Sequence, residues 1–397
     1  MQKFGGISRY FFEIFKRVSA TEDAVMAPRF NQNEYFKAVF TDRHDLCPGK
    51  KFPGKYHLRN FLEEMELRRQ LRTGSFGFVR PGCQAPAEII PAPAQRGPAP
   101  ADISPAPDQR VPAPAQRVPA PGKSRTFDII HHTGEFPLLF LYRRKVPVVV
   151  TIHDMIPEEY NDRRRIWQRR LCVRKADHII CVSEYTRQSL LKWYPEVDPQ
   201  KTSVIYHGYS FPGFPKERVI QDEYILFVGN RGGYKNFNLM LEAVAGILKE
   251  RDLKLVCAGN LFAESEKKLI ESLGVGQNVI EFGFAGDEDL SSLYQYASLF
   301  IFPSKLEGFG IPILEAMSHD CPVCLSNASC FPEIAQDAAD YFDPDDMQSI
   351  AASITKVLDD AEYRKSLVDK GHARVKEFSW DKAAAETVYV YNKVLEK

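Results

Sequence analysis

Alternating apolar runs are the feature of this chain that most limits its fold. Short, mostly apolar runs recur between longer amphipathic stretches along the 397 residues. This order is typical of a parallel sheet whose strands are joined by crossover helices. We therefore predict an α/β fold. The expected strands are residues 127–131, 146–152, 178–182 and 204–206, followed by 224–228, 254–258, 279–282, 299–302 and 322–325.

The length of the chain and a break between the two strand series predict two domains. A chain of 397 residues is too long for one hydrophobic core and suits two α/β domains. Residues 208–222 combine glycine and proline with no apolar period, as expected of a linker. We place the boundary near Gly213, between an N-terminal domain at 1–212 and a C-terminal domain at 213–378. The last segment, 379–397, has a helical pattern long enough to pack back on the first domain.

Charge and hydropathy narrow the function classes. The chain has 52 basic and 52 acidic residues, and this balance argues against a dedicated nucleic-acid binder. No stretch approaches the roughly 18 apolar residues of a membrane-spanning helix, and the N-terminus lacks the layout of a signal peptide. We therefore expect a cytoplasmic protein.

The cysteines suggest neither a disulfide framework nor a metal site. Eight cysteines are scattered along the chain, and such spacing without a secretory signal favours reduced thiols. Cys321 and Cys324 form a CxxC, which in principle suits zinc or redox chemistry. Because no second CxxC is present and the apolar run continues through this one, we expect buried structural thiols.

A proline-rich repeat interrupts the first predicted domain. Between residues 84 and 125 a Pro-Ala-Pro unit recurs every seven residues. A coiled coil has the same period, but proline at this density excludes it and favours polyproline II or disorder. We expect a surface insert, with a proline-rich partner site as the alternative. The repeated prolines are Pro91, Pro98, Pro105, Pro112 and Pro119.

The strongest local signal is the segment at 302–317, where a strand ends, a glycine-rich loop follows and Pro312 begins a helix. Such a turn presents backbone N–H groups to an anion, and its glycines permit a close approach. Glu307 and Glu315 could accept hydrogen bonds from the hydroxyls of one ligand. On spacing alone, a solvated loop acid and a helix N-terminal acid are the simpler interpretation, because two glutamates seven residues apart often occur by chance.

Several segments together resemble the retaining glycosyltransferases of family 4, which have the GT-B fold. The loop at 302–317 resembles the E-x7-E region of that family. Residues 4–10, Phe-Gly-Gly-Ile-Ser-Arg-Tyr, resemble its N-terminal glycine loop. Further matches are residues 151–157 (the histidine segment), 182–186 (a serine turn), 228–236 (the diphosphate segment) and 322–344 (the closing strand and loop). The resemblance implies two Rossmann-like domains that face each other across a cleft.

The resemblance also implies a role for each residue of the donor site. Glu315 would bind the ribose hydroxyls, and Glu307 the hydroxyls of the transferred sugar. Arg231 and Lys235 would stabilise the charge of the donor diphosphate in place of a metal ion. The remaining donor-binding positions, through close backbone approach, would be Gly5, Gly6, Gly308, Phe309 and Gly310. No metal site and no cofactor are implied; the co-substrate would be a GDP- or UDP-sugar.

Histidines in the first domain are the candidates on the opposite side of the cleft. His153 matches the family histidine that faces the donor sugar, and it follows a predicted strand, where α/β folds bind ligands. A structural role is the alternative for a histidine at a strand end. Asp154, His131 and His132 lie at similar strand ends and are candidates for contact with the acceptor.

The resemblance implies a retaining hexosyltransferase of surface polysaccharide synthesis, with a mannose or glucose donor and a glycan or lipid-linked acceptor. The sequence offers no evident general base, which suits attack on the same face of the sugar that the leaving phosphate departs from. Seven basic residues between 163 and 175, interleaved with apolar ones, suit peripheral contact with an anionic membrane. A solvated helix face is the alternative.

The chain departs from the family pattern at its start. Relatives carry a strand before the glycine loop, whereas Met1 precedes Gly5 by only a few residues. We therefore expect the first strand to be missing from this sequence. Either the true start of the protein lies upstream, or this form is truncated. This leaves an inactive nucleotide-binding homologue as one alternative and a nucleotide-sugar epimerase as another. A dehydrogenase is disfavoured, because no G-x-G-x-x-G follows a predicted strand.

Overall fold

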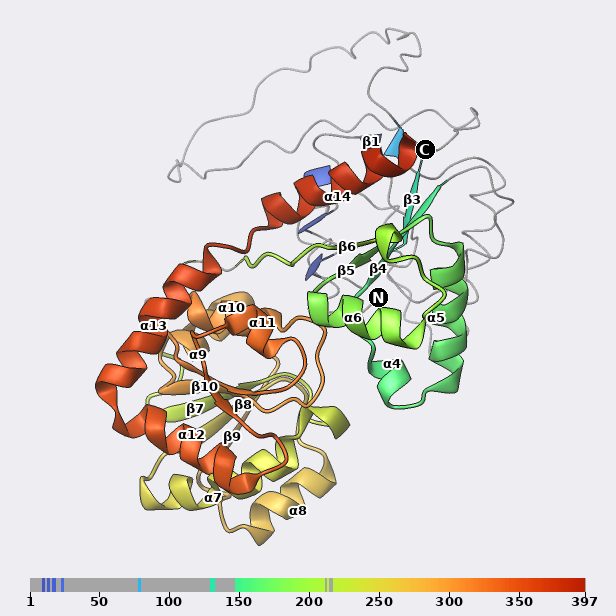
Figure 1. The fold of residues 1–397 in the computed structure, drawn as a ribbon. Helices are drawn as coiled ribbons and strands as arrows, with labels where there is room; N and C mark the ends of the chain where they lie inside the picture. The colour runs from blue at the N-terminus through green and yellow to red at the C-terminus, as the bar shows by residue number, and fades with distance from the viewer. Residues whose placement is uncertain are drawn as a thin grey trace, which may run out of the picture.

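The computed structural model describes residues 147–210, 213 and 217–396, together with short stretches at 9–10, 13–14, 16–18, 23–24, 78–79 and 129–132. The proline-rich repeat at 84–125 and the predicted glycines Gly5 and Gly6 lie outside these residues. The described chain forms two lobes, each built on a parallel sheet (Figure 1).

The larger sheet has six parallel strands in the order β12-β11-β10-β7-β8-β9. This is the doubly wound order, in which the direction of winding reverses between β7 and β10. The central strands are mostly buried apolar runs, which is the pattern expected when helices cover both faces. The strands are β7 (Tyr224–Val228), β8 (Lys254–Ala258), β9 (Val279–Gly283), β10 (Leu299–Phe302), β11 (Val323–Ser326) and β12 (Asp340–Phe342).

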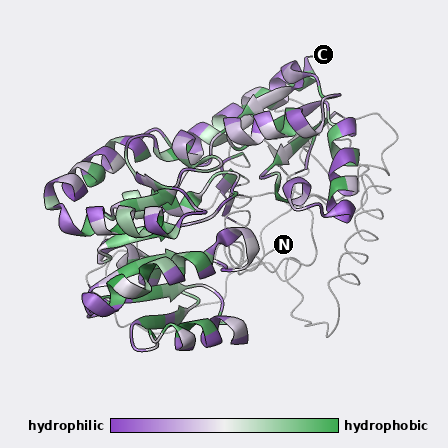
Figure 2. Ribbon diagram, turned by 60° about the horizontal axis from the view of Figure 1, so that its bottom comes forward, coloured by the Kyte–Doolittle hydropathy of each residue, from purple (hydrophilic) through white to green (hydrophobic). Residues whose placement is uncertain are grey.

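Helices surround this sheet with their polar faces outward, and Figure 2 shows green strands beneath helices with purple outer surfaces. In α7, for example, Phe237, Met240, Leu241 and Val244 repeat at helical spacing and are buried. The helices are α7 (Phe237–Glu250), α8 (Glu264–Ser272), α9 (Asp287–Gln295), α10 (Ile311–Met317), α11 (Phe331–Ala335), α12 (Met347–Asp359) and α13 (Ala361–Val375), with the short 3-10 turn η3 (Gly233–Lys235).

The smaller sheet belongs to the first lobe and has four described strands, all parallel, in the order β3-β4-β5-β6. Its strands are β3 (Ile130–His132), β4 (Val148–Ile152), β5 (His178–Cys181) and β6 (Thr202–Val204), with helices α4 (Ile156–Glu159), α5 (Arg163–Lys175) and α6 (Glu184–Trp193) and the 3-10 turn η2 (Pro199–Lys201). A separate antiparallel pair joins β1 (Asp23–Ala24) to β2 (Phe78–Val79).

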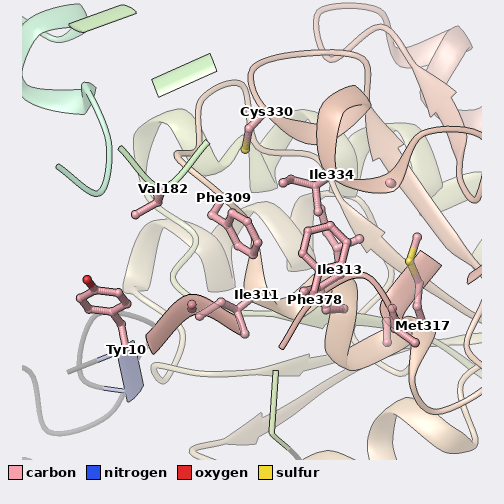
Figure 3. Close-up of a cluster of buried hydrophobic side chains, with 14 of the residues drawn as sticks. Tyr10, Val182, Phe309, Ile311, Ile313, Met317, Cys330, Ile334 and Phe378 are labelled. Atoms are coloured by element: carbon pink, nitrogen blue, oxygen red, sulfur yellow. The ribbon is translucent and has the colours of Figure 1, made fainter. Parts of the chain in front are cut away.

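The last helix, α14 (Trp380–Leu395), crosses from the second lobe to the first (Figure 1). Near its C-terminal end, the hydroxyl of Tyr391 lies 2.6 Å from Nδ1 of His131 in β3. Near its start, the ring of Trp380 packs against that of Tyr10. One core cluster therefore includes residues of both lobes, and Figure 3 shows Tyr10 and Val182 of the first near Phe309, Ile313 and Phe378 of the second.

The sequence predicted most strands to within two residues. The prediction at 204–206 was two residues late, since β6 spans Thr202–Val204. β12 was missed, because three residues beginning with an aspartate carry too little apolar signal to stand out from a loop. The domain limits stay predictions; the first sheet ends at Val204 and the second begins at Tyr224.

The CxxC lies in the core of the second lobe, as predicted. Cys321 and Cys324 are buried, and β11 contains the second of them. Burial raises the pKa of the Cys324 thiol to about 12. All six cysteines in the described part of the chain are buried free thiols, so they act as small apolar side chains.

Candidate active site

The predicted site residues follow the carboxyl ends of four strands. His153 follows β4, Ser183 follows β5, and the segment with Arg231 and Lys235 follows β7. The loop at 303–310 follows β10, beside the point where the order of the second sheet reverses. Ligands of doubly wound sheets bind at this position, because the strand ends and helix starts leave a crevice there.

The glycine-rich loop lies directly against the first lobe. A Cβ atom added to Gly308 would be 1.7 Å from the carbonyl oxygen of His153, a contact that only glycine permits. The carbonyl oxygen of Gly308 accepts hydrogen bonds from Ser183 Oγ at 2.6 Å and Thr186 Oγ1 at 3.2 Å. The predicted serine turn and histidine segment therefore both hold this loop.

Lys235 and Glu307, predicted for the diphosphate and the transferred sugar, form an ion pair. Lys235 Nζ lies 2.6 Å from Glu307 Oε1, and both side chains are largely buried. Asp154 lies near enough to this pair for both charges to act on it. Burial raises the pKa of Asp154 to about 6, and the negative charge of Glu307 is among the further causes. The structure thus brings a loop acid of the first lobe close to the E-x7-E loop.

Arg231 is held by groups that the sequence did not single out. Its Nε lies 3.0 Å from Glu266 Oε1, and Nη2 donates to the carbonyl oxygen of Asn260 at 2.7 Å. The guanidinium also lies over the ring of Phe262. The third nitrogen, Nη1, is buried and has no hydrogen-bond acceptor among the described residues. A buried donor of this kind suits an anionic ligand.

Glu315 is buried on α10 and is contacted from both lobes. Its Oε1 accepts from Arg9 Nη1 at 3.1 Å, and its Oε2 accepts from the hydroxyl of Tyr294 at 3.2 Å. Burial raises the pKa of Glu315, and the charge of Arg9 opposes this rise. Arg9 was not predicted as a site residue, although the motif at 4–10 contains it.

His153 lies among other rings at the junction of the lobes. Its ring meets the ring of Tyr10 edge-on, with centroids 4.9 Å apart, and lies 5.7 Å from that of His207. The following loop is supported by Arg169 of α5, which donates to the carbonyl oxygen of Asp154 and pairs with Glu158 at 2.7 Å. Arg169 is one of the seven basic residues at 163–175, but its side chain is buried.

The remaining predicted residues of the described chain are His131, His132, Phe309 and Gly310. His131 Nε2 lies 2.7 Å from Thr151 Oγ1, and burial lowers the pKa of His131 to about 3, so its ring is a neutral link between β4 and α14. His132 is half-buried in β3. Phe309 packs its ring in the core, and Gly310, at φ +89°, precedes α10. Acceptor and donor roles for these positions stay predictions.

A second contact between the lobes was not predicted from the sequence. The carboxylate of Glu333 in α11 accepts hydrogen bonds from the backbone N–H groups of Glu184, at 2.6 Å, and Tyr185, at 2.9 Å. These are the first two residues of α6, where free N–H groups favour an anion. Local sequence could not reveal this pair, because its partners are about 150 positions apart and meet only in the folded chain.

The acids at 343–346 belong to a turn that contains Pro344. Asp343 Oδ1 accepts from the backbone N–H of Asp345 at 2.9 Å, an arrangement that closes the turn before α12. Among residues 147–210 and 217–396, no three His, Cys, Asp or Glu side chains cluster as metal ligands.

Comparison with known proteins supports the family suggested by these features. Residues 214–374 match the model for "Glycosyl transferases group 1", and residues 78–210 match that for "Glycosyltransferase Family 4". The chain is 31% identical to O-antigen chain mannosyltransferase B of Escherichia coli over an alignment of 286 residues, which covers 66% of this chain and 74% of that protein. It is 28% identical over 301 residues to an MMP α-(1→4)-mannosyltransferase of Mycolicibacterium hassiacum, covering 69% and 72% of the two chains.

Solved structures agree in fold. HepE of Anabaena, crystallised with UDP and glucose, superposes with a TM-score of 0.67 at 15% identity over 97% of this chain and 95% of its own. At that identity the likeness shows the fold and nothing finer. Taken with the sequence matches and the two lobes built on parallel sheets, it leads to one conclusion. The chain belongs to the family 4 glycosyltransferases and is a hexosyltransferase with the GT-B fold.

Proposed function

We propose that this protein transfers a hexose from a nucleotide-sugar to a glycan or lipid-linked acceptor, with retention of anomeric configuration and without a metal ion. The observation that carries the proposal is the contact of Lys235 with Glu307 at 2.6 Å. In the proposal, Lys235 is the cation for the diphosphate and Glu307 the acceptor for sugar hydroxyls. A contact between them suits the point where the two halves of a nucleotide-sugar are joined.

The cations of the second lobe serve the leaving group. Arg231 and Lys235 both follow β7, and each is positioned by a carboxylate and aromatic rings. When the bond between the anomeric carbon and the diphosphate oxygen breaks, negative charge grows on that oxygen. Fixed cations stabilise it without the reorganisation that water would need. Nη1 of Arg231 is the donor best placed to gain a new partner.

The first lobe supplies the opposite wall of the sugar site. His153 and Asp154 lie against the loop of Glu307 and Gly308. In the proposed reaction, the acceptor oxygen forms its bond to the anomeric carbon on the face that the diphosphate leaves. The acceptor proton passes to the departing phosphate oxygen, so the products are a glycoside and a nucleoside diphosphate. This route requires no separate general base.

The relatives favour a mannose donor and surface polysaccharide as the product. Two of them are named for mannosyl transfer, one of these for O-antigen chains. The family resemblance leaves the base and the sugar as GDP or UDP and mannose or glucose. An inactive homologue would bind a donor without turnover, and an epimerase would release a sugar still attached to its nucleotide.

We further propose peripheral contact with an anionic membrane through α5. Trp167 is 58% exposed on this helix, between arginines that also face solvent. None of the described helices is long and apolar enough to cross a bilayer. Trp167→Ala should weaken co-sedimentation with vesicles that contain anionic phosphatidylglycerol, while leaving turnover of a soluble acceptor unchanged. Equal sedimentation of both forms would contradict this contact.

The experiment that tests the transferase proposal measures nucleotide release and product formation from ADP-, GDP- and UDP-sugars in excess EDTA. Wild type should turn over one donor. Glu307→Ala and Arg231→Ala should each reduce its turnover by about a hundredfold or more. Arg251→Ala is the matched control, because Arg251 pairs with Asp359 on the surface. Turnover that EDTA abolishes would contradict metal independence, and a β-glycoside from an α-linked donor would contradict retention.

A further inference from the structure

Arg9 is a cation of the first lobe that reaches into the second lobe at Glu315. It is only 5% exposed, yet its guanidinium contacts three groups that lie far away in the sequence. Nη1 donates to Glu315 Oε1 at 3.1 Å and to the carbonyl oxygen of Ser210 at 2.8 Å. Nη2 lies 2.8 Å from Asp287 Oδ2. Burying an arginine is costly unless each contact is well made, so these contacts are specific.

We propose that Arg9 is a positioning residue for the ribose of the donor, acting across the domain interface through Glu315. This inference rests on the proposed function, in which Glu315 binds the ribose hydroxyls. It adds a residue of the opposite lobe to that site. Recognition of the ribose then depends on how the two lobes are arranged.

The geometry of Glu315 supports this role. An ionised carboxylate can accept about four hydrogen bonds. Arg9 holds one oxygen and the hydroxyl of Tyr294 holds the other, from opposite ends of the group. The two contacts define the orientation of the carboxylate and leave capacity for the two neighbouring hydroxyls of a ribose. A carboxylate held in this way binds a cis-diol without first having to reorient.

The charges around Glu315 also support a positioning role for Arg9. Burial favours the protonated form of Glu315 and raises its pKa, whereas the ionised form is the better acceptor for two hydroxyls. The positive charge of Arg9 acts against this rise, and Asp287, which bears negative charge, acts with it. Because Arg9 lies between the two acids and contacts both, it offsets the repulsion that would otherwise push a proton onto Glu315.

The sharpest test uses ribose discrimination rather than overall activity. The probes are the nucleoside diphosphate that binds tightest among ADP, GDP and UDP, and its 2′,3′-dideoxy analogue. Isothermal titration calorimetry gives the ratio of the two dissociation constants. Wild type should favour the ribose form by about tenfold or more, as expected for hydrogen bonds to a charged acceptor. Glu315→Gln and Arg9→Met should each bring the ratio towards one.

A double variant separates positioning from general damage. If Arg9 acts through Glu315, Arg9→Met should change the ratio little further in the Glu315→Gln background. Arg9→Lys keeps the charge but loses the forked contact to Glu315 and Asp287, so it should retain only part of the discrimination. Arg17→Met is the matched control. Arg17 belongs to the same N-terminal segment, but it pairs with Glu13 and Asp381, away from Glu315.

The outcomes distinguish the two proposals. If Glu315→Gln loses the discrimination while Arg9→Met and Arg9→Lys keep it, Arg9 does not position Glu315 and the inference is wrong. Equal weakening of both probes in Arg9→Met, at an unchanged ratio, would assign Arg9 a purely structural role and would also overturn it. If Arg9→Met does not fold, the ratio of Arg9→Lys decides. Wild type that binds none of the diphosphates, or a Glu315→Gln that discriminates normally, would instead contradict the proposed donor site.

Discussion

The carbonyl oxygen of His153 lies so close to Gly308 that a Cβ atom on the glycine would be 1.7 Å away. This contact joins the histidine segment of the first lobe to the E-x7-E loop of the second, over 155 positions of sequence. Both belong to motifs that the sequence indicates separately. Only the fold shows that the backbone of His153 restricts position 308 to glycine.

A methyl group at position 308 should therefore impair transfer. In Gly308→Ala the loop must move away from His153, and a displacement of about 1 Å near reacting groups can cost about a hundredfold in rate. Steady-state kinetics with the best donor would measure this loss in kcat/KM. Gly276→Ala is the control, since a Cβ there would meet nothing within 4 Å. Wild-type kinetics for Gly308→Ala would mean that the loop and His153 separate in the working enzyme.

The ion pair of Lys235 and Glu307 should act as one unit in catalysis. Lys235→Met and Glu307→Gln should each lower kcat/KM by about tenfold or more, and the double variant should lose much less than the product of the two effects. The expected coupling is about 1–3 kcal/mol, because the pair is largely buried. Lys267→Met with Glu264→Gln provides an exposed pair of the same types for comparison. Additive losses at 235 and 307 would argue that the two groups serve separate steps.

Glu333 should stabilise the junction between the lobes. Glu333→Ala removes the acceptor for the N–H groups of Glu184 and Tyr185 at the start of α6. We expect a loss of about 1–3 kcal/mol in the free energy of unfolding, measured with urea and followed by circular dichroism. Glu271→Ala, on an exposed face of α8, should change it little. Unchanged stability of Glu333→Ala would show that water replaces the carboxylate at no cost.

His131 should make the fold sensitive to mild acid. Its pKa is lowered from 6.5 to about 3, chiefly by burial, so the folded protein keeps it neutral. The stabilising contribution is present above the unfolded pKa of 6.5 and is lost as pH falls towards 3. Between pH 7.5 and 5.5, His131 should account for a loss of about 1 kcal/mol. His131→Gln should lose less stability than wild type over this range; an equal or larger loss would contradict the assignment.

Local patterns in the sequence were sufficient to predict the architecture, and they indicated several residues of the candidate site. The strands β7 and β10 are continuous apolar runs, and β8 is apolar after Lys254; such runs can be recognised without a partner segment. The loop with Glu307, Gly308 and Pro312 is contiguous, so its chemistry is visible in one short segment. The family resemblance then related this loop to Arg231 and Lys235, and the structure brings Lys235 into contact with Glu307.

The sequence by itself determined which side chains were available, and the tertiary structure decided which of them meet. Arg9 with Glu315, Arg231 with Glu266 and Glu333 with α6 are pairs between distant segments, and no local period encodes such a contact. Burial was decided in the same way. Arg169 resembles its solvated neighbours in sequence, yet in the fold it is turned inward to Glu158 and supports the loop of Asp154. The physical reason is that contact and desolvation depend on packing between elements, which only the whole folded chain specifies.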